Sequence, residues 1–383
     1  MRKTSWKAKS HRRKTKFRRP AQNGLTSYES NRFRLRSERK PEPVCRPGDF
    51  KFAAVALDHG HIYGQRNGLI EAGAELCWVF DPDIHKVERF RKAFPQTEVA
   101  QSLDQVLGDP AIHLIAAAAV PSERGPLGTR VMQAGKHYFT DKPPFTELSQ
   151  LEEARRFAAE TGKKYMVYYS ERLHVECAVF AGELIHQGAI GRVIQVLGLG
   201  PHRLSAEERP AWFFERARYG GILCDIGSHQ IEQFLFYSGA SDATVTSARV
   251  ANFGHKQYPE LEDFGDATLV ADNGAVSYFR VDWFTPDGLR SWGDGRAFIL
   301  GTDGYIEMRK YIDVGRQVEG DHLFLVDKQG EQHFELYGKV GFPFFGRLIQ
   351  DCLNATETAM TQAHAFKAAE LCLKAQSFAQ RIE

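Results

Sequence analysis

The chain has 383 residues, of which 43% are hydrophobic and 26% are charged, and this is enough apolar material for two domains of ordinary size. The length excludes a peptide hormone or a disulfide miniprotein, and the longest apolar run, residues 114–120, is far too short to span a membrane. The formal net charge of +2 hides an asymmetry, because residues 1–50 carry 16 Lys/Arg against 4 Asp/Glu while the remainder is acidic.

The basic segment, residues 1–50, contains few aliphatic side chains. It cannot bury enough apolar surface to offset the entropy lost on ordering, so we expect a disordered tail. It lacks the apolar stretch of a signal peptide, and more basic residues follow Arg12-Arg13 in place of the apolar core that twin-arginine export requires. Basic residues attract nucleic acid, but a solvated arm on a partner subunit, or an over-long start of the reading frame, explains the tail better.

Six cysteines are scattered over the chain. No two are close in sequence, and no spacing suits a zinc site or a disulfide framework. The pattern favours a reducing compartment. We therefore expect a cytoplasmic protein that has no membrane partner.

Between residues 51 and 170, apolar runs of strand length alternate with amphipathic patterns of helix length. The expected strands are residues 52–57, 76–80, 114–120, 137–140 and 165–169, and the expected helices are residues 62–72, 84–94, 127–134 and 148–160. This alternation predicts a parallel, doubly wound sheet with right-handed crossovers. The fold class is therefore α/β, with a Rossmann-type dinucleotide-binding domain over residues 51–170.

After about residue 190, strand-like runs follow one another without intervening helices. They cover residues 193–199, 244–251, 267–271, 275–284, 297–300, 305–308 and 323–326, and helices at 345–354 and 363–381 close the chain. Such a succession predicts a C-terminal α+β domain, residues 171–383, with a large, mostly antiparallel open sheet. Because Val276, Tyr278 and residues 281–284 leave much apolar surface for water, we expect another subunit on one face, in a homodimer or tetramer.

Residues 58–64, which follow the first expected strand, read DHGHIYG where a dinucleotide-binding fold places its phosphate turn. Gly60 matches the second glycine of Gly-x-Gly-x-x-Gly, whereas Asp58 replaces the first and would repel phosphate if it faced the ligand. The residues expected to hold the cofactor here are Gly60, His61, Ile62 and Tyr63. A metal site at His59 and His61 is the weaker interpretation because no third ligand is nearby in sequence, so no metal is predicted.

Asp81 ends the second expected strand, 21 residues after Gly60. A carboxylate at this place can accept both ribose hydroxyls of NAD and would repel the 2′-phosphate of NADP. The alternative is that Asp81 only caps the following helix. The spacing favours NAD as the cofactor, with NADP as the alternative.

Two later segments carry a family resemblance. Residues 140–144 read TDKPP and residues 220–229 read GGILCDIGSH. Together they resemble the Glu-Lys-Pro and Gly-Gly-x-x-x-Asp-x-Gly-x-His motifs of the glucose-fructose oxidoreductase and inositol dehydrogenase (Gfo/Idh/MocA) family, and the resemblance extends in order from residue 51 to about residue 383. Two departures are Asp141 in place of the usual Glu, and Gly125 where many members have a histidine.

The resemblance implies oxidation of an alcohol. Loss of hydride from a carbon that bears a hydroxyl requires a base near neutral pKa for the proton and a cation for the developing alkoxide, and His229 and Lys142 fit these roles. Asp225, four residues before His229, should share its helix face and orient the imidazole or hold a second substrate hydroxyl. The alternative is a helix cap at Asp225 with His229 on the surface. The resemblance also places a commonly cis Lys142-Pro143 bond beside the nicotinamide.

Further site residues are expected around these three. The resemblance implies that Pro121 and Ser122, which stand at the family's Thr-Pro-Asn turn after the third expected strand, contact the cofactor. The weaker candidates for substrate contacts are Tyr169, Glu171, Arg172, His202, Arg203 and Trp212, and the aromatic residues 212–214 could equally belong to the core.

We interpret the sequence as an NAD(P)-dependent oxidoreductase that acts on a sugar, a cyclic polyol or a related carbohydrate derivative. One alternative is a glycoside hydrolase that uses NAD for transient oxidation and elimination. A second is a non-catalytic nucleotide-binding regulator on the same fold, against which the set Lys142, Asp225 and His229 argues. Fold alone does not select the substrate.

Overall fold

The computed structural model describes residues 42–315 and 319–383. Most of the predicted basic tail, residues 1–50, lies outside the described residues. Within the described ranges, no helix is both long enough and apolar enough to cross a membrane.

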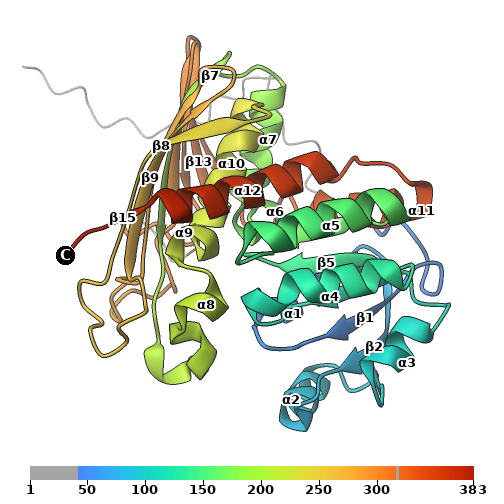
Figure 1. Ribbon diagram of the computed structural model, residues 1–383. Helices are drawn as coiled ribbons and strands as arrows, with labels where there is room; N and C mark the ends of the chain where they lie inside the picture. The colour runs from blue at the N-terminus through green and yellow to red at the C-terminus, as the bar shows by residue number, and fades with distance from the viewer. Residues whose placement is uncertain (1–41, 316–318) are drawn as a thin grey trace, which may run out of the picture.

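The N-terminal part of the chain forms a parallel sheet of six strands in the order β3-β2-β1-β4-β5-β6 (Figure 1). The strands are β1 (Lys51–Val55), β2 (Glu75–Phe80), β3 (Glu98–Val99), β4 (Leu114–Ala117), β5 (His137–Asp141) and β6 (Tyr165–Tyr168). The predicted Rossmann-type sheet is confirmed. The strand order reverses between the neighbours β1 and β4, and ligands of such sheets bind beyond the carboxyl ends of the strands at this point.

Five helices connect these strands. They are α1 (His61–Glu71), α2 (Ile84–Ala93), α3 (Leu103–Gly108), α4 (Pro121–Gln133) and α5 (Leu148–Thr161). Helix α4 begins six residues before the expected start at residue 127, because Pro121 occupies its first turn, where proline is favoured. Pro126 lies inside the helix and cannot donate to the Ser122 carbonyl, which instead accepts a hydrogen bond from Gln150 Nε2 at 3.0 Å.

The C-terminal sheet has nine strands in the order β14-β13-β12-β11-β7-β10-β9-β8-β15. They are β7 (Val193–Pro201), β8 (Ala243–Ala251), β9 (Phe264–Ala271), β10 (Val276–Asp282), β11 (Arg296–Gly301), β12 (Gly304–Arg309), β13 (His322–Asp327), β14 (Gly330–Glu335) and β15 (Gln380–Arg381). The predicted mostly antiparallel sheet is confirmed. Two neighbouring pairs, β7 with β10 and β8 with β15, are parallel.

Helices cover one face of this sheet. The principal ones are α7 (Glu176–His186), α9 (Ile222–Asp225), α10 (Gly227–Ser238) and α12 (Gln362–Phe378). Helix α10 packs closely against β7. The absence of a side chain at Gly198 allows this contact, since a Cβ atom there would overlap the Gln230 side chain. Helix α12 runs from β8 to α5, so it joins the two sheets (Figure 1).

The opposite face of the C-terminal sheet carries exposed apolar side chains. Tyr278 and Phe298 both pair with Leu197 of β7, so the three side chains form a row, and Leu300 and Tyr305 are also exposed. The expectation that residues 281–284 belong to this face is only partly right. Val281 and Trp283 are buried, whereas Phe284 is exposed, because alternate residues of a strand point to opposite faces.

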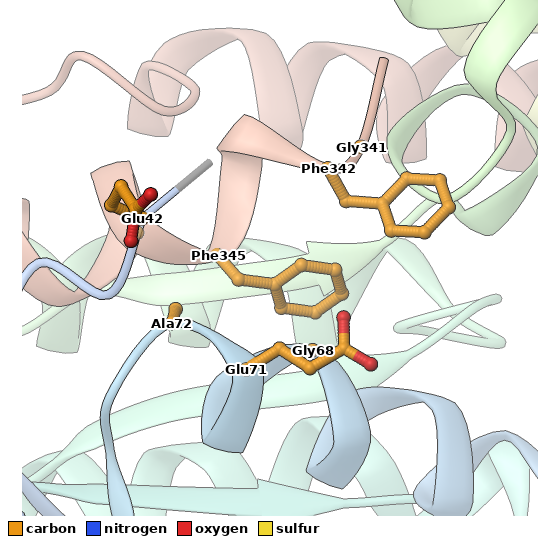
Figure 2. Close-up of a pocket in the computed structure, with 8 residues that line it drawn as sticks. Glu42, Gly68, Glu71, Ala72, Gly341, Phe342 and Phe345 are labelled. Atoms are coloured by element: carbon orange, nitrogen blue, oxygen red, sulfur yellow. The ribbon is translucent and has the colours of Figure 1, made fainter. Parts of the chain in front are cut away.

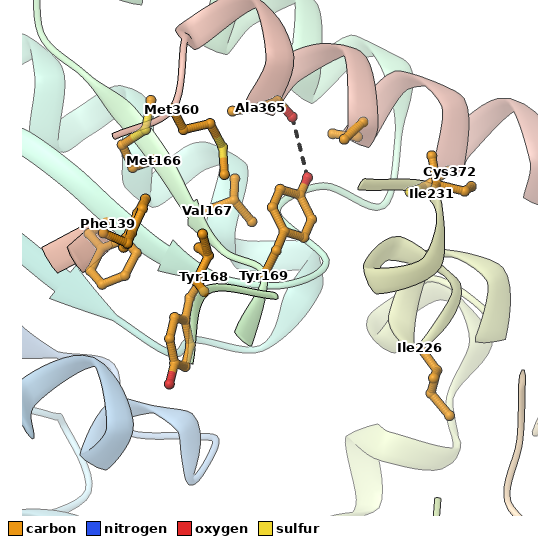
Figure 3. Packing of buried hydrophobic residues seen from close by; sticks show 14 of the residues in the cluster. Phe139, Met166, Val167, Tyr168, Tyr169, Ile226, Ile231, Met360, Ala365 and Cys372 are labelled. Carbon is orange, nitrogen blue, oxygen red and sulfur yellow. Dashed lines mark hydrogen bonds between the residues drawn. The ribbon is translucent and has the colours of Figure 1, made fainter. Parts of the chain in front are cut away.

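One hydrophobic core extends through both halves of the chain. Figure 3 shows the side chains of β5 and β6 beside α12 and the helices of the second half. Tyr169, directly after β6, donates a hydrogen bond from its hydroxyl to the Ala365 carbonyl in α12 at 3.3 Å. This packing places the carboxyl end of the first sheet next to α9 and α10.

Candidate active site

Lys142 and Asp225 meet where the first sheet faces α9. Lys142 directly follows β5, and its Nζ donates to Asp225 Oδ1 at 2.6 Å, with both residues buried. The Lys142-Pro143 bond is cis, as predicted. Gly220 and Gly221 adopt φ of +88° and +92°, a region that favours glycine, and this turn ends α8 (Arg216–Tyr219) and starts α9, whose last residue is Asp225.

Asp225 and His229 both lie in helical segments, as expected, because α10 begins two residues after α9 ends. The carboxylate binds the lysine, however, and its described hydrogen bonds do not include one to the imidazole. Burial alone would raise the pKa of Asp225, but the adjacent Lys142 ammonium lowers it. Asp225 is therefore placed to orient Lys142 rather than His229.

His229 is buried, and its Nδ1 has no hydrogen-bond partner among the described residues. Burial, reinforced by the positive charge of Lys142, lowers the pKa of His229 to about 3, although Glu171 opposes the shift. The imidazole is neutral at physiological pH. The expectation of a base with near-neutral pKa is thus wrong for the unliganded protein, because the sequence does not reveal how deeply the ring is buried.

The phosphate turn has room for a ligand. Gly60 is the N-cap of α1, and a Cβ atom there would meet nothing within 4 Å. His61, Ile62 and Tyr63 begin the helix, so their amides contribute to its positive end. The predicted repulsion by Asp58 is neutralised, because Lys86 donates to its Oδ1 at 2.6 Å. These features fit the pyrophosphate of a dinucleotide.

Asp81 is less free than the sequence suggests. Its carboxylate accepts hydrogen bonds from the backbone N–H groups of Leu57 at 2.7 Å and Asp83 at 2.8 Å, and Lys86 Nζ lies 3.6 Å away. The side chain is only 2% exposed. Asp83, not Asp81, is the N-cap of α2. Asp81 therefore ties the ends of β1 and β2 together, and a ribose would have to compete with these contacts.

Asp141, next to Lys142, is in contact with three basic side chains. Its carboxylate lies 3.1 Å from His59 Nδ1, 2.7 Å from His61 Nδ1 and 3.2 Å from Arg124 Nη2. The two histidines and Asp141 could ligate a metal, since their ligand atoms lie within 4.8 Å of one another. The buried Arg124 already pairs with this carboxylate and competes with a divalent ion for it. The absence of a metal stays a prediction.

Arg124 was not predicted from the sequence. It donates to the carbonyl oxygens of Ala119 at 2.7 Å and Pro143 at 3.1 Å, and also to that of Lys142. The guanidinium therefore fixes the turn that carries the lysine. Pro121 and Ser122 lie at the start of the same helix. The only sequence signal is a charged residue in a segment expected to be a loop.

Two of the predicted substrate residues are occupied elsewhere. Arg172 makes a two-pronged ion pair with the buried Glu232 and stacks on Phe236, so it is not directed at Lys142. Arg203 donates to the carbonyls of Pro286 and Ser291 and holds that loop.

The other four candidates have different settings. The Tyr169 hydroxyl is bound to the Ala365 carbonyl, and Glu171 is buried and bound to Lys310. Trp212 is buried in a short 3-10 helix, η2 (Ala211–Phe214), as the core alternative anticipated. His202 stays near the site, with its Nε2 3.8 Å from Glu171 Oε1.

A pocket near α1 is distinct from this site. Figure 2 shows it between the C-terminal half of α1 and helix α11 (Pro343–Asn354). It is lined by Glu42, Gly68, Glu71, Ala72, Gly341, Phe342, Phe345 and Gly346. None of these residues belongs to the predicted site, and the phosphate turn lies at the other end of α1.

The pKa shifts predict acid-sensitive stability. Burial lowers the pKa of five histidines, to about 4 for His59, His137, His174 and His202 and about 3 for His229. The unfolded chain therefore takes up more protons than the folded chain between about pH 6.5 and 4, and stability falls as the pH decreases through this window. We expect the free energy of unfolding in urea to be several kcal/mol lower at pH 5 than at pH 7, with the partly exposed His59, His174 and His202 contributing less. Equal values at the two pH values would contradict the burial of these rings.

Two family models match the chain. Residues 56–169 match the oxidoreductase family with an NAD-binding Rossmann fold, and residues 179–307 match the GFO/IDH/MocA C-terminal domain. A crystal structure from Erwinia carotovora atroseptica SCRI1043, provisionally described as an oxidoreductase, is 51% identical and superposes with a TM-score of 0.85 over 88% of this chain and 100% of that chain. The structure of levoglucosan dehydrogenase with NADH and levoglucosan shares the fold at 17% identity, with a TM-score of 0.71 over 86% of this chain and 96% of that chain.

Curated relatives match more weakly. A scyllo-inositol 2-dehydrogenase (NADP(+)) of Bacillus subtilis is 26% identical over 48% of this chain and 50% of its own length. A D-xylose dehydrogenase of Paenarthrobacter nicotinovorans is 27% identical over 53% of this chain and 52% of its own length. The chain thus spans about half the length of these curated relatives.

Proposed function

The chain belongs to the Gfo/Idh/MocA family of oxidoreductases, and from this premise we propose that it transfers a hydride between a sugar, cyclic polyol or related carbohydrate derivative and the nicotinamide of NAD(P). The observation that carries the proposal is the buried ion pair of Lys142 with Asp225 at the carboxyl edge of the first sheet, where β5 ends. His229 follows Asp225 by one helical turn. Relatives named for inositol, xylose and levoglucosan support the substrate class.

The chain's own residues handle charge and protons. When bound, the nicotinamide supplies the hydride acceptor or donor. The Lys142 ammonium, held by Asp225, stabilises negative charge on the substrate oxygen and so lowers the pKa of its hydroxyl. The neutral imidazole of His229 then accepts the hydroxyl proton, even though its own pKa is low. Arg124 acts through the Lys142-Pro143 turn as a positioning residue.

The cofactor would lie across the carboxyl ends of β1, β4 and β5. Its phosphates would lie at the positive end of α1 beside Gly60, where the turn has open space. The amides of His61, Ile62 and Tyr63 already donate to His59 and Gly60, so phosphate would compete with these hydrogen bonds. Pro121, Ser122 and the Lys142-Pro143 turn would border the nicotinamide half. We propose NAD as the preferred cofactor because Asp81 adds negative charge at the end of β2, and NADP is the alternative.

Lys86 offers a test of this placement. It neutralises Asp58 and lies 3.6 Å from Asp81, so Lys86→Met leaves two carboxylates beside the phosphate turn. We expect the variant to bind NAD about tenfold more weakly, and wild type to bind NAD more tightly than NADP. Calorimetric titration of both cofactors checks this. Unchanged NAD affinity in Lys86→Met would place the phosphates elsewhere, and tighter NADP binding by wild type would overturn the role of Asp81.

The activity itself is tested with a panel of sugars, polyols and their acids, incubated with NAD or NADP while the absorbance of reduced nicotinamide is followed. Accumulation of reduced cofactor with at least one carbohydrate supports the proposal. Hydrolysis of a glycoside without net reduction would instead indicate the glycoside hydrolase. Cofactor binding without turnover of any member would favour the regulator.

We further propose that the exposed face of the C-terminal sheet is covered by a second copy of the chain. Tyr278, Phe298 and Tyr305 lie on β10, β11 and β12 of this face, with β7 between β10 and β11, and each is more than a third exposed. We expect light scattering at micromolar concentration to give the mass of a dimer or tetramer, and Phe298→Glu to shift it towards the monomer. Gln133→Glu, at an exposed polar site on α4 in the first half of the chain, serves as the control. A monomeric wild type would contradict the proposal.

A further inference from the structure

A second buried carboxylate lies behind His229. Glu171, in the short helix α6 (Ser170–Leu173), is 1% exposed. Its Oε2 accepts hydrogen bonds from Lys310 Nζ at 2.8 Å and Gln230 Nε2 at 3.1 Å. Its Oε1 is buried and has no hydrogen-bond partner among residues 42–315 and 319–383, with His202 Nε2 in ion-pair range at 3.8 Å. The oxygen Oε1 of this carboxylate therefore accepts no hydrogen bond from the described residues.

Helix α10 brings His229 to the same place. Gln230, the next residue, binds Glu171 directly. Gln233, one turn later on the face of His229, accepts from Lys310 Nζ at 2.8 Å and donates to the His229 carbonyl at 2.8 Å. Gln230 thus binds the Glu171 carboxylate, and Gln233 binds Lys310, which holds that carboxylate. The Nδ1 atom of His229 is also buried and has no hydrogen-bond partner among the described residues.

Two unsatisfied buried atoms of complementary kind are costly to leave apart. We propose that Glu171 is the carboxylate that orients the catalytic imidazole. The described ion pairs of Glu171 do not include His229, so the Nδ1–H would reach the carboxylate through one bridging water molecule. The inference rests on the proposed function, in which His229 is the base. It makes Glu171 a positioning residue and Lys310 the cation that holds Glu171 in place.

The consequence for the chemistry is a fixed tautomer. With its proton held on Nδ1, the ring presents the lone pair of Nε2 to the substrate hydroxyl. When Nε2 takes that proton the ring becomes cationic, and the Glu171 carboxylate stabilises the imidazolium. Asp225 binds Lys142 through Oδ1, and its described hydrogen bonds and ion pairs do not include His229.

The charges around His229 agree with this assignment. Lys142, His202 and His61 lower its pKa in addition to the effect of burial, whereas Glu171 raises it. Burial alone would raise the pKa of Glu171, but Lys310, His229 and His202 together lower it, so the carboxylate stays ionised. Gln230 and Gln233 carry no charge.

The test reads the tautomer directly. In the full chain labelled with ¹⁵N-histidine, the His229 signals, assigned by their loss in His229→Gln, should show a proton on Nδ1 at neutral pH. Glu171→Gln should convert them to a mixture or to the Nε2–H form, and Glu171→Asp, which keeps the charge, should restore the Nδ1–H form at least in part. An Nε2–H tautomer in wild type, or identical His229 signals in wild type and Glu171→Gln, would overturn the inference.

Glu232→Gln is the matched control. Glu232 is also a buried carboxylate, on α10 itself, but it pairs with Arg172 and His364 instead. The variant should lower the melting temperature without altering the His229 signals. If the wild-type chain oxidises a member of the carbohydrate panel, Glu171→Gln should reduce its kcat roughly 10- to 100-fold with NAD affinity unchanged, and Glu232→Gln should not. Failure of the whole panel would refute the proposed activity and leave the tautomer result standing.

Discussion

Lys142→Met should reduce turnover roughly 10²- to 10⁴-fold. In the wild type the ammonium is buried and hydrogen-bonded to Asp225 at 2.6 Å, so its charge is little screened by water. Methionine fills a similar volume without the charge, and negative charge would then develop on the substrate oxygen without a cation. NAD affinity, measured by calorimetry, should change little, because in the proposed placement the phosphate turn at Gly60 would make the principal contacts of the cofactor.

Lys136→Met is the control for the removal of a buried lysine. Lys136 is as buried as Lys142, but its Nζ donates to the carbonyls of Asp109 at 2.6 Å and Ile112 at 3.0 Å, before β5 rather than after it. The control variant should be less stable and nearly fully active. Near-normal turnover in Lys142→Met would refute the mechanism and leave only the fold.

His229→Ala should also lower turnover roughly 10²- to 10⁴-fold, because no other group is assigned to take the hydroxyl proton. His137→Ala is the control, since His137 is another buried histidine with a pKa of about 4, in the first sheet and hydrogen-bonded to the backbone of Lys164. It should cost stability and spare turnover. A fully active His229→Ala variant would remove the base from the account.

The pH profile distinguishes a His229 with a near-neutral pKa, as expected from the sequence, from a His229 whose pKa is lowered by burial. A base with a pKa of about 3 in the free protein is already neutral at pH 5 and above. The acidic limb of kcat/KM, which reports free-enzyme ionisations, should therefore not contain a step near pH 6.5 that disappears in His229→Ala. Observation of such a step would mean that His229 is more hydrated than its burial indicates.

Regular alternation made the first sheet predictable from the sequence. Strands that are very short or carry few apolar residues could not be predicted from the sequence. Strand β14 carries mostly polar residues at the edge of its sheet, and β3 and β15 have two residues each. The predicted helix began at residue 127, after Gly125 and Pro126, which are usual helix breakers. In the structure the helix continues through them, and Gln150 donates to the Ser122 carbonyl that Pro126 leaves without a donor.

The site was predictable where a motif names the residue, as for Lys142, Asp225 and His229. The partners were not, because they are distant in sequence. Asp225 lies 83 residues from Lys142, and the spacing within the motif suggested His229 as its partner instead. The same limit led us to expect a substrate contact from Arg172, which pairs with Glu232, 60 residues away.

The central claim is hydride transfer from a carbohydrate carbon, and isotope transfer measures it most directly. A carbohydrate that the panel identifies is prepared with deuterium on the reacting carbon and incubated with the protein and the oxidised cofactor, and the reduced nicotinamide is then analysed by mass spectrometry. The account predicts that the reduced cofactor gains the deuterium in the wild type, and that its rate of appearance falls with Lys142→Met and not with Lys136→Met. Product formation with no deuterium in the nicotinamide would contradict it.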